Sequence, residues 1–327
     1  MPELAVVVPV YGCVECLEQL HRRLSEATSV ITTDYELIFV DDRSPDGSWP
    51  LLEELARSDP HVRSIRLSRN FGQHAAITAG LAASDAAWTA VMDCDLQDPP
   101  EALPALFARA REGFDLVLAR RKQRSHSVLR LWMARAYFKL LNTFMGTRLD
   151  GEFGTFSILN RKVVDAFLTL GDQDRHYLSI LQWLGFEQGT IDIQHASRAA
   201  GKSSYTFGRL VRHAVSGVFF QTTNILLYIV YMGFLLAGGG ILLAIYLVVL
   251  AIVRTPPPGW TSVMVAELVI GGFIITSLGV TGLYIGRVFQ QVKGRPLYVV
   301  DAVERQSGTR PTRDTPAQHE KVESRTR

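Results

Sequence analysis

Trp88-Thr89-Ala90-Val91-Met92-Asp93-Cys94-Asp95 is the stretch that indicates the fold of this chain, and Leu96-Gln97-Asp98-Pro99-Pro100 follows it. A short apolar run is typical of a buried strand, and here acidic side chains begin where the strand should end. Close carboxylates repel one another unless a cation offsets them, and hard oxygen ligands suit Mg²⁺ or Mn²⁺. The turn is therefore a candidate metal site. The alternative is an acidic turn that caps a helix beginning near Pro99 or Pro100.

Similar apolar runs precede this one and predict strands at Leu4–Val10, Tyr35–Val40 and Val62–Leu67, with a later strand at Leu116–Leu118. Stretches with helical spacing separate them, at Val14–Ala27, Trp49–Arg57 and Gln73–Ala83. Strands that alternate with helices indicate an α/β fold with a mostly parallel sheet. Ligands of such sheets bind where the strands end. We therefore expect the polar segments after four strands to converge on one edge.

The second half of the chain has a different composition. Residues 225–253 and 263–285 contain almost no charge, and each could cross about 30 Å of hydrocarbon. The Pro-rich segment 254–260 between them reads as a tight loop, so a two-helix transmembrane hairpin is expected. Basic residues flank both segments, which predicts cytoplasmic flanks. The net charge of +2 argues against a nucleic-acid-binding protein.

These patterns predict four regions: a cytoplasmic catalytic domain at 1–204, an interfacial helix at 205–223, the hairpin at 224–288 and a cytoplasmic tail at 289–327. The polar composition predicts disorder from about residue 301. A helix at 128–144 fits either core packing or a membrane interface. Small residues in both apolar segments permit close helix contacts, within the hairpin or in a homo-oligomer.

The chain has three cysteines, Cys13, Cys16 and Cys94. The spacing of Cys13 and Cys16 raises the alternative of a redox motif. Three cysteines cannot form a four-thiolate zinc site, and we expect free thiols in a reducing compartment.

An ordered set of motifs resembles the family 2 glycosyltransferases of GT-A fold: Val6-Val7-Val8-Pro9-Val10-Tyr11, Val40-Asp41-Asp42-Arg43-Ser44-Pro45-Asp46-Gly47, Arg69-Asn70-Phe71-Gly72 and Asp93-Cys94-Asp95-Leu96-Gln97-Asp98-Pro99. The chain most resembles the polyprenyl-phosphate glycosyltransferases, the group with dolichyl-phosphate mannose synthase and bacterial undecaprenyl-phosphate sugar transferases. The resemblance runs from about residue 4 to residue 300. It implies a Rossmann-like GT-A domain followed by membrane helices.

The resemblance also implies roles for individual residues. Asp42 matches the residue that contacts the nucleotide base, and Pro9 and Tyr11 shape the same pocket. Asp93, Asp95 and Gln97 match residues around the donor diphosphate and its divalent metal. Arg120 matches the arginine that meets the acceptor phosphate. The wider set of expected acceptor contacts is Arg120, Arg121, Arg124, Arg130, Arg198 and Lys202.

The chain departs from the family pattern at several positions. Many relatives have Gly-Asp-Phe-Arg where this chain has Gly154-Thr155-Phe156-Ser157, and Glu152 is a nearby substitute for the missing acid. Gln73 stands where some relatives have lysine. A phosphate acceptor does not need the missing acid as a base, because a phosphate monoester with a second pKa of about 6 is already anionic at pH 7.

The expected activity is inverting transfer of one sugar from a nucleotide-diphosphate sugar, with UDP favoured, to a polyprenyl phosphate. It would depend on Mg²⁺ or Mn²⁺ and take place at the cytoplasmic face of a bacterial inner membrane. The alternatives are a transferase with a hydroxyl acceptor, as in polysaccharide synthesis, and a non-catalytic nucleotide-binding membrane partner.

Overall fold

The computed structural model describes residues 1–122, 153–173, 175–194 and 259–306, with isolated residues between 231 and 249. The chain divides into two compact units. The first takes Met1–Lys139, Thr147–Ser204 and Pro296–Arg327, and the second takes Leu140–Gly146 and Tyr205–Arg295. In the sequence, the second unit is thus inserted between parts of the first.

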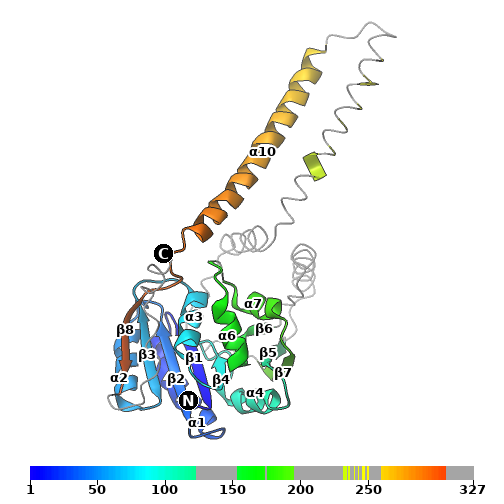
Figure 1. Ribbon diagram of the computed structural model, residues 1–327. Coiled ribbons are helices and arrows are strands. Elements are labelled where there is room, and N and C mark those ends of the chain that lie inside the picture. Colours follow the sequence, from blue (N-terminus) through cyan, green and yellow to red (C-terminus); the bar gives the residue numbers. More distant parts are fainter. Residues whose placement is uncertain are drawn as a thin grey trace, which may run out of the picture. The chain divides into compact units, whose positions relative to one another are not determined.

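The first unit is built on an eight-stranded sheet in the order β7-β5-β6-β4-β1-β2-β3-β8 (Figure 1). Its strands are β1 (Leu4–Val10), β2 (Tyr35–Asp41), β3 (Val62–Leu67), β4 (Trp88–Val91), β5 (Leu116–Lys122), β6 (Phe153–Asn160), β7 (Gln188–Gln194) and β8 (Val300–Arg305). The centre, β3-β2-β1-β4, is parallel, whereas β6 runs antiparallel to both β4 and β5. The sheet is therefore mixed, and the predicted GT-A-like α/β fold is confirmed.

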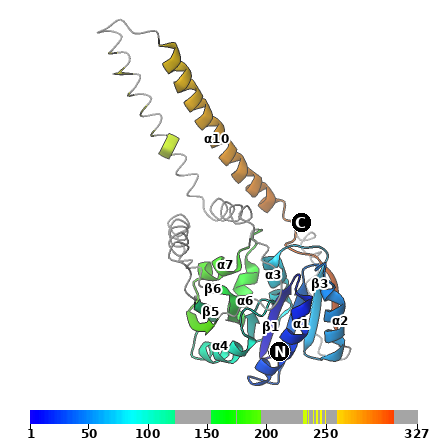
Figure 2. The same ribbon diagram turned by 180° about the vertical axis from the view of Figure 1, so that it is seen from behind.

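Helices cover both faces of the sheet (Figures 1 and 2). One face carries α1 (Val14–Ser29), α2 (Ser48–Ser58) and α4 (Leu103–Ala110), and the other carries α3 (Gln73–Ala83), α6 (Arg161–Thr169) and α7 (Tyr177–Leu184). Alternate residues of β1 enter the two cores, since Val6 and Val8 belong to the first and Ala5 and Val7 to the second. A fully buried central strand with helices on both sides explains the continuous apolar run of β1.

The elements predicted between Leu4 and Met92 agree with the structure to within the fraying of an element's end. The predicted helix near Pro100 begins as a short 3₁₀ turn, η1 (Pro100–Ala102), which leads into α4. The strands and helices from β6 to β7 were not predicted from the sequence.

The prediction of disorder from about residue 301 is wrong for the first residues of that segment. They form β8, which pairs antiparallel with the edge of β3. The segment is polar because β8 is an edge strand whose charges are paired: Asp301 binds Arg43 at 2.7 Å, and Arg305 lies 3.5 Å from Glu36. Just before β8, Tyr298 is buried in the core that α3 shares with α6 and α7.

The second unit contains α10 (Trp260–Val292), a 33-residue helix. No helix within the described ranges combines the length and apolar character needed to cross a membrane. Other predictions fall outside the described residues: the helices at 128–144 and 205–223, most of the apolar segment 225–253, and Arg124, Glu152, Arg130, Arg198 and Lys202.

Candidate active site

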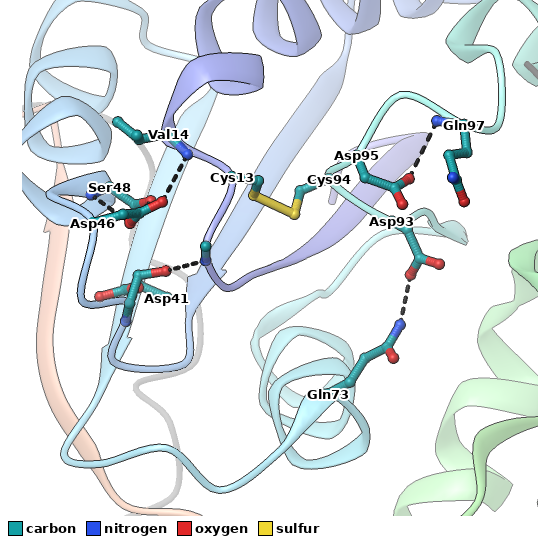
Figure 3. Close-up of a disulfide and its surroundings, with 12 residues drawn as sticks. Cys13, Val14, Asp41, Asp46, Ser48, Gln73, Asp93, Cys94, Asp95 and Gln97 are labelled. Atoms are coloured by element: carbon teal, nitrogen blue, oxygen red, sulfur yellow. Dashed lines mark hydrogen bonds between the residues drawn. A yellow bond between two sulfur atoms is a disulfide. The ribbon is translucent and has the colours of Figure 1, made fainter. Parts of the chain in front are cut away.

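The segments that follow β1, β2 and β4 meet at one edge of the sheet, as the sequence predicts (Figure 3). Backbone hydrogen bonds continue beyond the strands there. The N–H of Asp42 donates to Val10 at 3.0 Å, and the N–H of Met92 donates to Val7 at 3.0 Å. The segments that begin the loops after β2 and β4 are thus both hydrogen-bonded to β1.

The loop between β2 and α2 holds the start of α1. The N–H of Val14, the first residue of α1, donates to Oδ2 of Asp46 at 2.9 Å, and the N–H of Gly12 donates to Ser44 Oγ at 2.7 Å. Asp46 Oδ1 accepts from Ser48. Although burial raises the pKa of Asp46, the hydrogen bonds from Ser48 and Val14 lower it overall. Ser44 and Asp46 therefore shape the loop, a role that the sequence did not reveal.

Asp42, the expected base contact, is almost fully buried. Its carboxylate accepts from the backbone N–H of Phe71 at 2.7 Å and of Gly72 at 2.8 Å. Burial raises the pKa of Asp42, and these two hydrogen bonds oppose the rise. Asp42 thus joins the end of β2 to the segment that begins α3. At the same edge Pro9 is buried and Tyr11 is 53% exposed, so a base contact by these residues stays a prediction.

Residues 93–98, here called the acidic turn, follow β4. Leu96 adopts a positive φ of 58° and Asp95 Oδ1 accepts from the N–H of Gln97 at 3.2 Å, so the chain reverses tightly. The structure therefore brings together Asp93, Asp95 and Gln97, the expected metal ligands (Figure 3).

Two residues that depart from the family pattern both bind Asp93. Gln73 Nε2 donates to Asp93 Oδ1 at 2.6 Å, and Thr155 Oγ1 donates to the same oxygen at 2.7 Å. Burial raises the pKa of Asp93, and Asp95 and Asp98 raise it further, while the hydrogen bond from Thr155 opposes the rise. The sequence marked Gln73 and Thr155 as unusual, but it gave no sign that they meet.

The two expected acceptor arginines on β5, Arg120 and Arg121, bind different carboxylates. Arg121 binds Asp98 of the acidic turn through two hydrogen bonds, at 3.1 and 2.7 Å. Arg120 instead binds Asp192 of β7 at 2.6 Å. Gly154 makes room for the guanidinium of Arg121, because a Cβ there would lie 2.5 Å from it. Arg121 is thus tied to the acidic turn by an ion pair, while contact of either arginine with an acceptor stays a prediction.

The expectation of three free thiols is wrong. Cys13 and Cys94 form a disulfide that joins the turn after β1 to the acidic turn, and Cys16 is a buried free thiol (Figure 3). The physical reason is the parallel pairing of β1 with β4, which places the residues after both strands side by side. A separation of 81 residues in sequence hides this proximity.

The donor set of the acidic turn fits a divalent cation that also binds phosphate. Within the described residues, no three His, Cys, Asp or Glu side chains gather into a metal-binding group. The acidic turn offers the carboxylates of Asp93 and Asp95 and the amide of Gln97, while its third carboxylate, Asp98, is bound by Arg121. Mg²⁺ typically binds one or two carboxylates and completes its shell with phosphate oxygens and water. Such a turn suits a metal that arrives with a diphosphate.

Comparisons with known proteins show which family the chain resembles. A family model described as Glycosyl transferase family 2 matches residues 5–168. The uncharacterized glycosyltransferase YkcC of Bacillus subtilis is 32% identical, over 91% of this chain and 93% of that protein. The undecaprenyl-phosphate 4-deoxy-4-formamido-L-arabinose transferase of Proteus mirabilis is 33% identical, over 92% and 94%. The SfII prophage-derived bactoprenol glucosyl transferase of Shigella flexneri is 30% identical, over 91% and 97%.

Proposed function

Because the chain belongs to glycosyl transferase family 2 and is a glycosyltransferase, we propose that it moves one sugar from a nucleotide-diphosphate sugar to a polyprenyl phosphate. The observation that carries the proposal is the acidic turn at the carboxyl edge of the sheet, beside the turn after β1. The acceptor class is supported by relatives named for undecaprenyl phosphate and bactoprenol, which match this chain over nearly their whole length.

The proposed reaction is a single displacement. An oxygen of the acceptor phosphate forms a bond to the anomeric carbon as the bond from that carbon to the diphosphate oxygen breaks. The bonding electron pair leaves with the nucleoside diphosphate, and attack from the opposite face inverts the anomeric configuration. When bound, Mg²⁺ or Mn²⁺ neutralises charge on the departing diphosphate, and Asp93, Asp95 and Gln97 are the residues that would hold it.

No general base is required in this mechanism. A phosphate monoester has a second pKa of about 6, so its attacking oxygen already carries charge at pH 7. Thr155 occupies the position where many relatives have an acid, and its hydroxyl is used to bind Asp93. This arrangement favours a phosphate acceptor over a sugar hydroxyl, since a hydroxyl would need a group to remove its proton.

Cations and apolar surface support the lipid part of the proposal. Arg120, Arg121 and Lys122 end β5, and the chain continues into further basic residues that include Arg124 and Arg130. Such clusters bind phosphate and anionic headgroups. Large apolar side chains, among them Leu278 and Ile285, are exposed along α10. We place the enzyme at the cytoplasmic face of a bacterial inner membrane, attached through its apolar segments.

Transfer assays on the purified full chain test the proposed reaction. A panel of labelled nucleotide sugars, UDP-sugars first, is incubated with undecaprenyl phosphate and Mg²⁺ or Mn²⁺. We expect one sugar per lipid, released by mild acid, and no product with EDTA. Undecaprenol is the matched acceptor that lacks the phosphate and should stay unmodified. Glycosylated undecaprenol or a growing sugar polymer would refute the phosphate acceptor.

Cell fractionation tests the location. We expect the chain to stay in the membrane fraction after alkaline carbonate washing, with a tag after Arg327 cleaved by protease only in inverted vesicles. Recovery in the soluble fraction, or cleavage in right-side-out vesicles, would contradict the proposed placement.

A further inference from the structure

Two uncharged donors converge on one oxygen of the acidic turn. Gln73 and Thr155 both donate to Oδ1 of Asp93, at 2.6 and 2.7 Å. They come from different elements on separate parts of the chain: Gln73 is the first residue of α3, and Thr155 is the third residue of β6. In the described part of the chain, both hydrogen bonds to Asp93 go to Oδ1. Within the same residues, no side chain donates to the second oxygen, Oδ2, and the nearby positive charge that acts on Asp93 is Arg121, which binds Asp98.

The two donors are uncharged, which affects the electrostatics of Asp93. An amide and a hydroxyl can orient a carboxylate without adding a positive charge beside it. A lysine at either position would orient the same oxygen but offset the charge of Asp93. With Gln73 and Thr155, Asp93 is fixed in direction and remains available to attract a cation.

Gln73 is held in place by the scaffold around α3. Gly80 brings this helix against β1, because a Cβ at Gly80 would lie 2.2 Å from Cγ1 of Val7. The segment before the helix is bound by Asp42, which accepts from Phe71 and Gly72. The position of Gln73 is therefore set by β1 and β2.

Thr155 has comparable support on the other side. The hydroxyl of Ser157 donates to the carbonyl of Thr155 at 2.8 Å and also bonds the hydroxyl of fully buried Tyr177 at 2.8 Å. Ser157 pairs directly with Val91, the last residue of β4. Thr155 is thus anchored to β4, the strand that leads into the acidic turn.

We propose that Gln73 and Thr155 are positioning residues that together fix Asp93 through Oδ1 and so direct Oδ2 to the cation of the donor diphosphate. The inference rests on the proposed function, because it assumes that a nucleotide-diphosphate sugar brings the cation to the acidic turn. Residues that orient metal ligands in this way typically contribute about 10- to 100-fold to metal affinity or activity.

The test compares Mn²⁺ binding by full-length variants in detergent, followed by the electron paramagnetic resonance signal of free Mn²⁺ in the presence of UDP. Thr155→Val and Gln73→Met should each weaken Mn²⁺ binding about 10- to 100-fold. Thr155→Ser keeps the hydroxyl and should restore most of the affinity. Thr89→Val is the matched control, because Thr89 lies at the other end of β4 and its buried hydroxyl bonds Ser84.

Two further readouts separate positioning from simple structural support. In transfer assays, the apparent Mn²⁺ constant should rise in Thr155→Val, and saturating Mn²⁺ should recover much of kcat. Thr89→Val should lower the melting temperature and leave the Mn²⁺ constant unchanged. A folded Thr155→Val chain that binds Mn²⁺ like the wild type would overturn the proposal, even if sugar transfer is confirmed. Weakened Mn²⁺ binding in Thr155→Val, rescued in Thr155→Ser, would support it even if the wild type transfers no sugar to polyprenyl phosphate.

Discussion

Asp93 and Asp95 belong to the same turn but are held differently. Asp93 accepts side-chain hydrogen bonds from α3 and β6, and Asp95 accepts a hydrogen bond from the backbone N–H of Gln97 within the turn. Asparagine at position 95 keeps an oxygen that can accept this bond and removes the negative charge. The substitution Asp95→Asn therefore tests whether the charge itself is needed.

Asp95→Asn should lower kcat/KM for sugar transfer by at least about 100-fold, the scale for loss of one charge-stabilising group. The amide oxygen can still accept from the N–H of Gln97, so the melting temperature should change little. Initial rates at several Mn²⁺ concentrations measure the effect. Asp34→Asn, at an exposed position before β2, is the matched control and should keep full activity. Full activity of Asp95→Asn, still sensitive to EDTA, would contradict the assignment.

His74 provides a prediction about pH. Burial, with a smaller effect from His176, lowers the pKa of His74 from 6.5 to about 4. In the unfolded chain, His74 therefore becomes protonated below about pH 6.5, whereas in the folded chain it stays neutral until about pH 4. Stability should fall as pH drops through this window, by about 1–3 kcal/mol from this group. His74→Gln should flatten that part of the curve, measured by urea unfolding. Equal slopes for both proteins would show that His74 is not the cause.

The role of a residue could be predicted only where the residues that act together belong to one short sequence motif. Asp93, Asp95 and Gln97 lie in one short segment of the sequence directly after β4, so their convergence could be predicted. Gln73 and Thr155 are 82 residues apart, and their shared contact depends on how α3 and β6 pack around β4, which no local pattern encodes. The ion pair of Arg121 with Asp98 could not be predicted either, because it also depends on how distant elements pack.

At the level of elements, the disulfide links two loops of the site. Cys13 immediately precedes α1 and Cys94 lies between the two aspartates of the acidic turn. The bond therefore restrains the acidic turn relative to α1, in addition to the pairing of β1 with β4.

Cys94→Ser should lower the free energy of unfolding by about 2–4 kcal/mol without reductant, as expected for loss of a disulfide that closes a long loop. Urea unfolding with and without dithiothreitol measures the difference. With dithiothreitol, the wild type and the variant should unfold at similar urea concentrations. Cys16→Ser is the comparison for a buried thiol outside the bond. Three alkylated thiols in unfolded, unreduced wild type would contradict the disulfide.

Elements were predicted well where local pattern and burial agree. The four strands from β1 to β4 are short apolar runs, and they alternate with segments whose apolar residues recur at helical spacing. Their positions along the chain could therefore be predicted. β8 was missed because it is rich in charged residues, among them Asp301 and Glu304, which form ion pairs with Arg43 and Arg57. Only its pairing with β3 makes it a strand, and that pairing is a property of the whole sheet.

At the scale of the whole molecule, the first unit is completed by residues that follow the second. Tyr298 fills the core and β8 covers the edge of β3, although both come after α10 in the sequence. An uncovered strand edge promotes aggregation. The final segment is therefore part of the catalytic fold.

A chain that ends after Gly294 should be less stable than a chain that ends after Gln306, by at least about 3 kcal/mol, the scale for losing a buried aromatic side chain. It should also aggregate on purification. Thermal unfolding of both truncated chains and the full-length chain measures the difference. The chain ending after Gln306 is the matched control, since it retains β8. Identical melting temperatures for the two truncations would show that β8 does not support the sheet.

The late position of β8 affects how the protein is made. β3 is complete when the ribosome has translated residue 67, but its partner strand ends at residue 305. At translation rates of roughly 5–20 residues per second, the edge of β3 remains without its partner strand for on the order of tens of seconds. A nascent chain that stalls before β8 cannot finish its catalytic sheet. Translation of the complete apolar insertion thus becomes a condition for a finished enzyme.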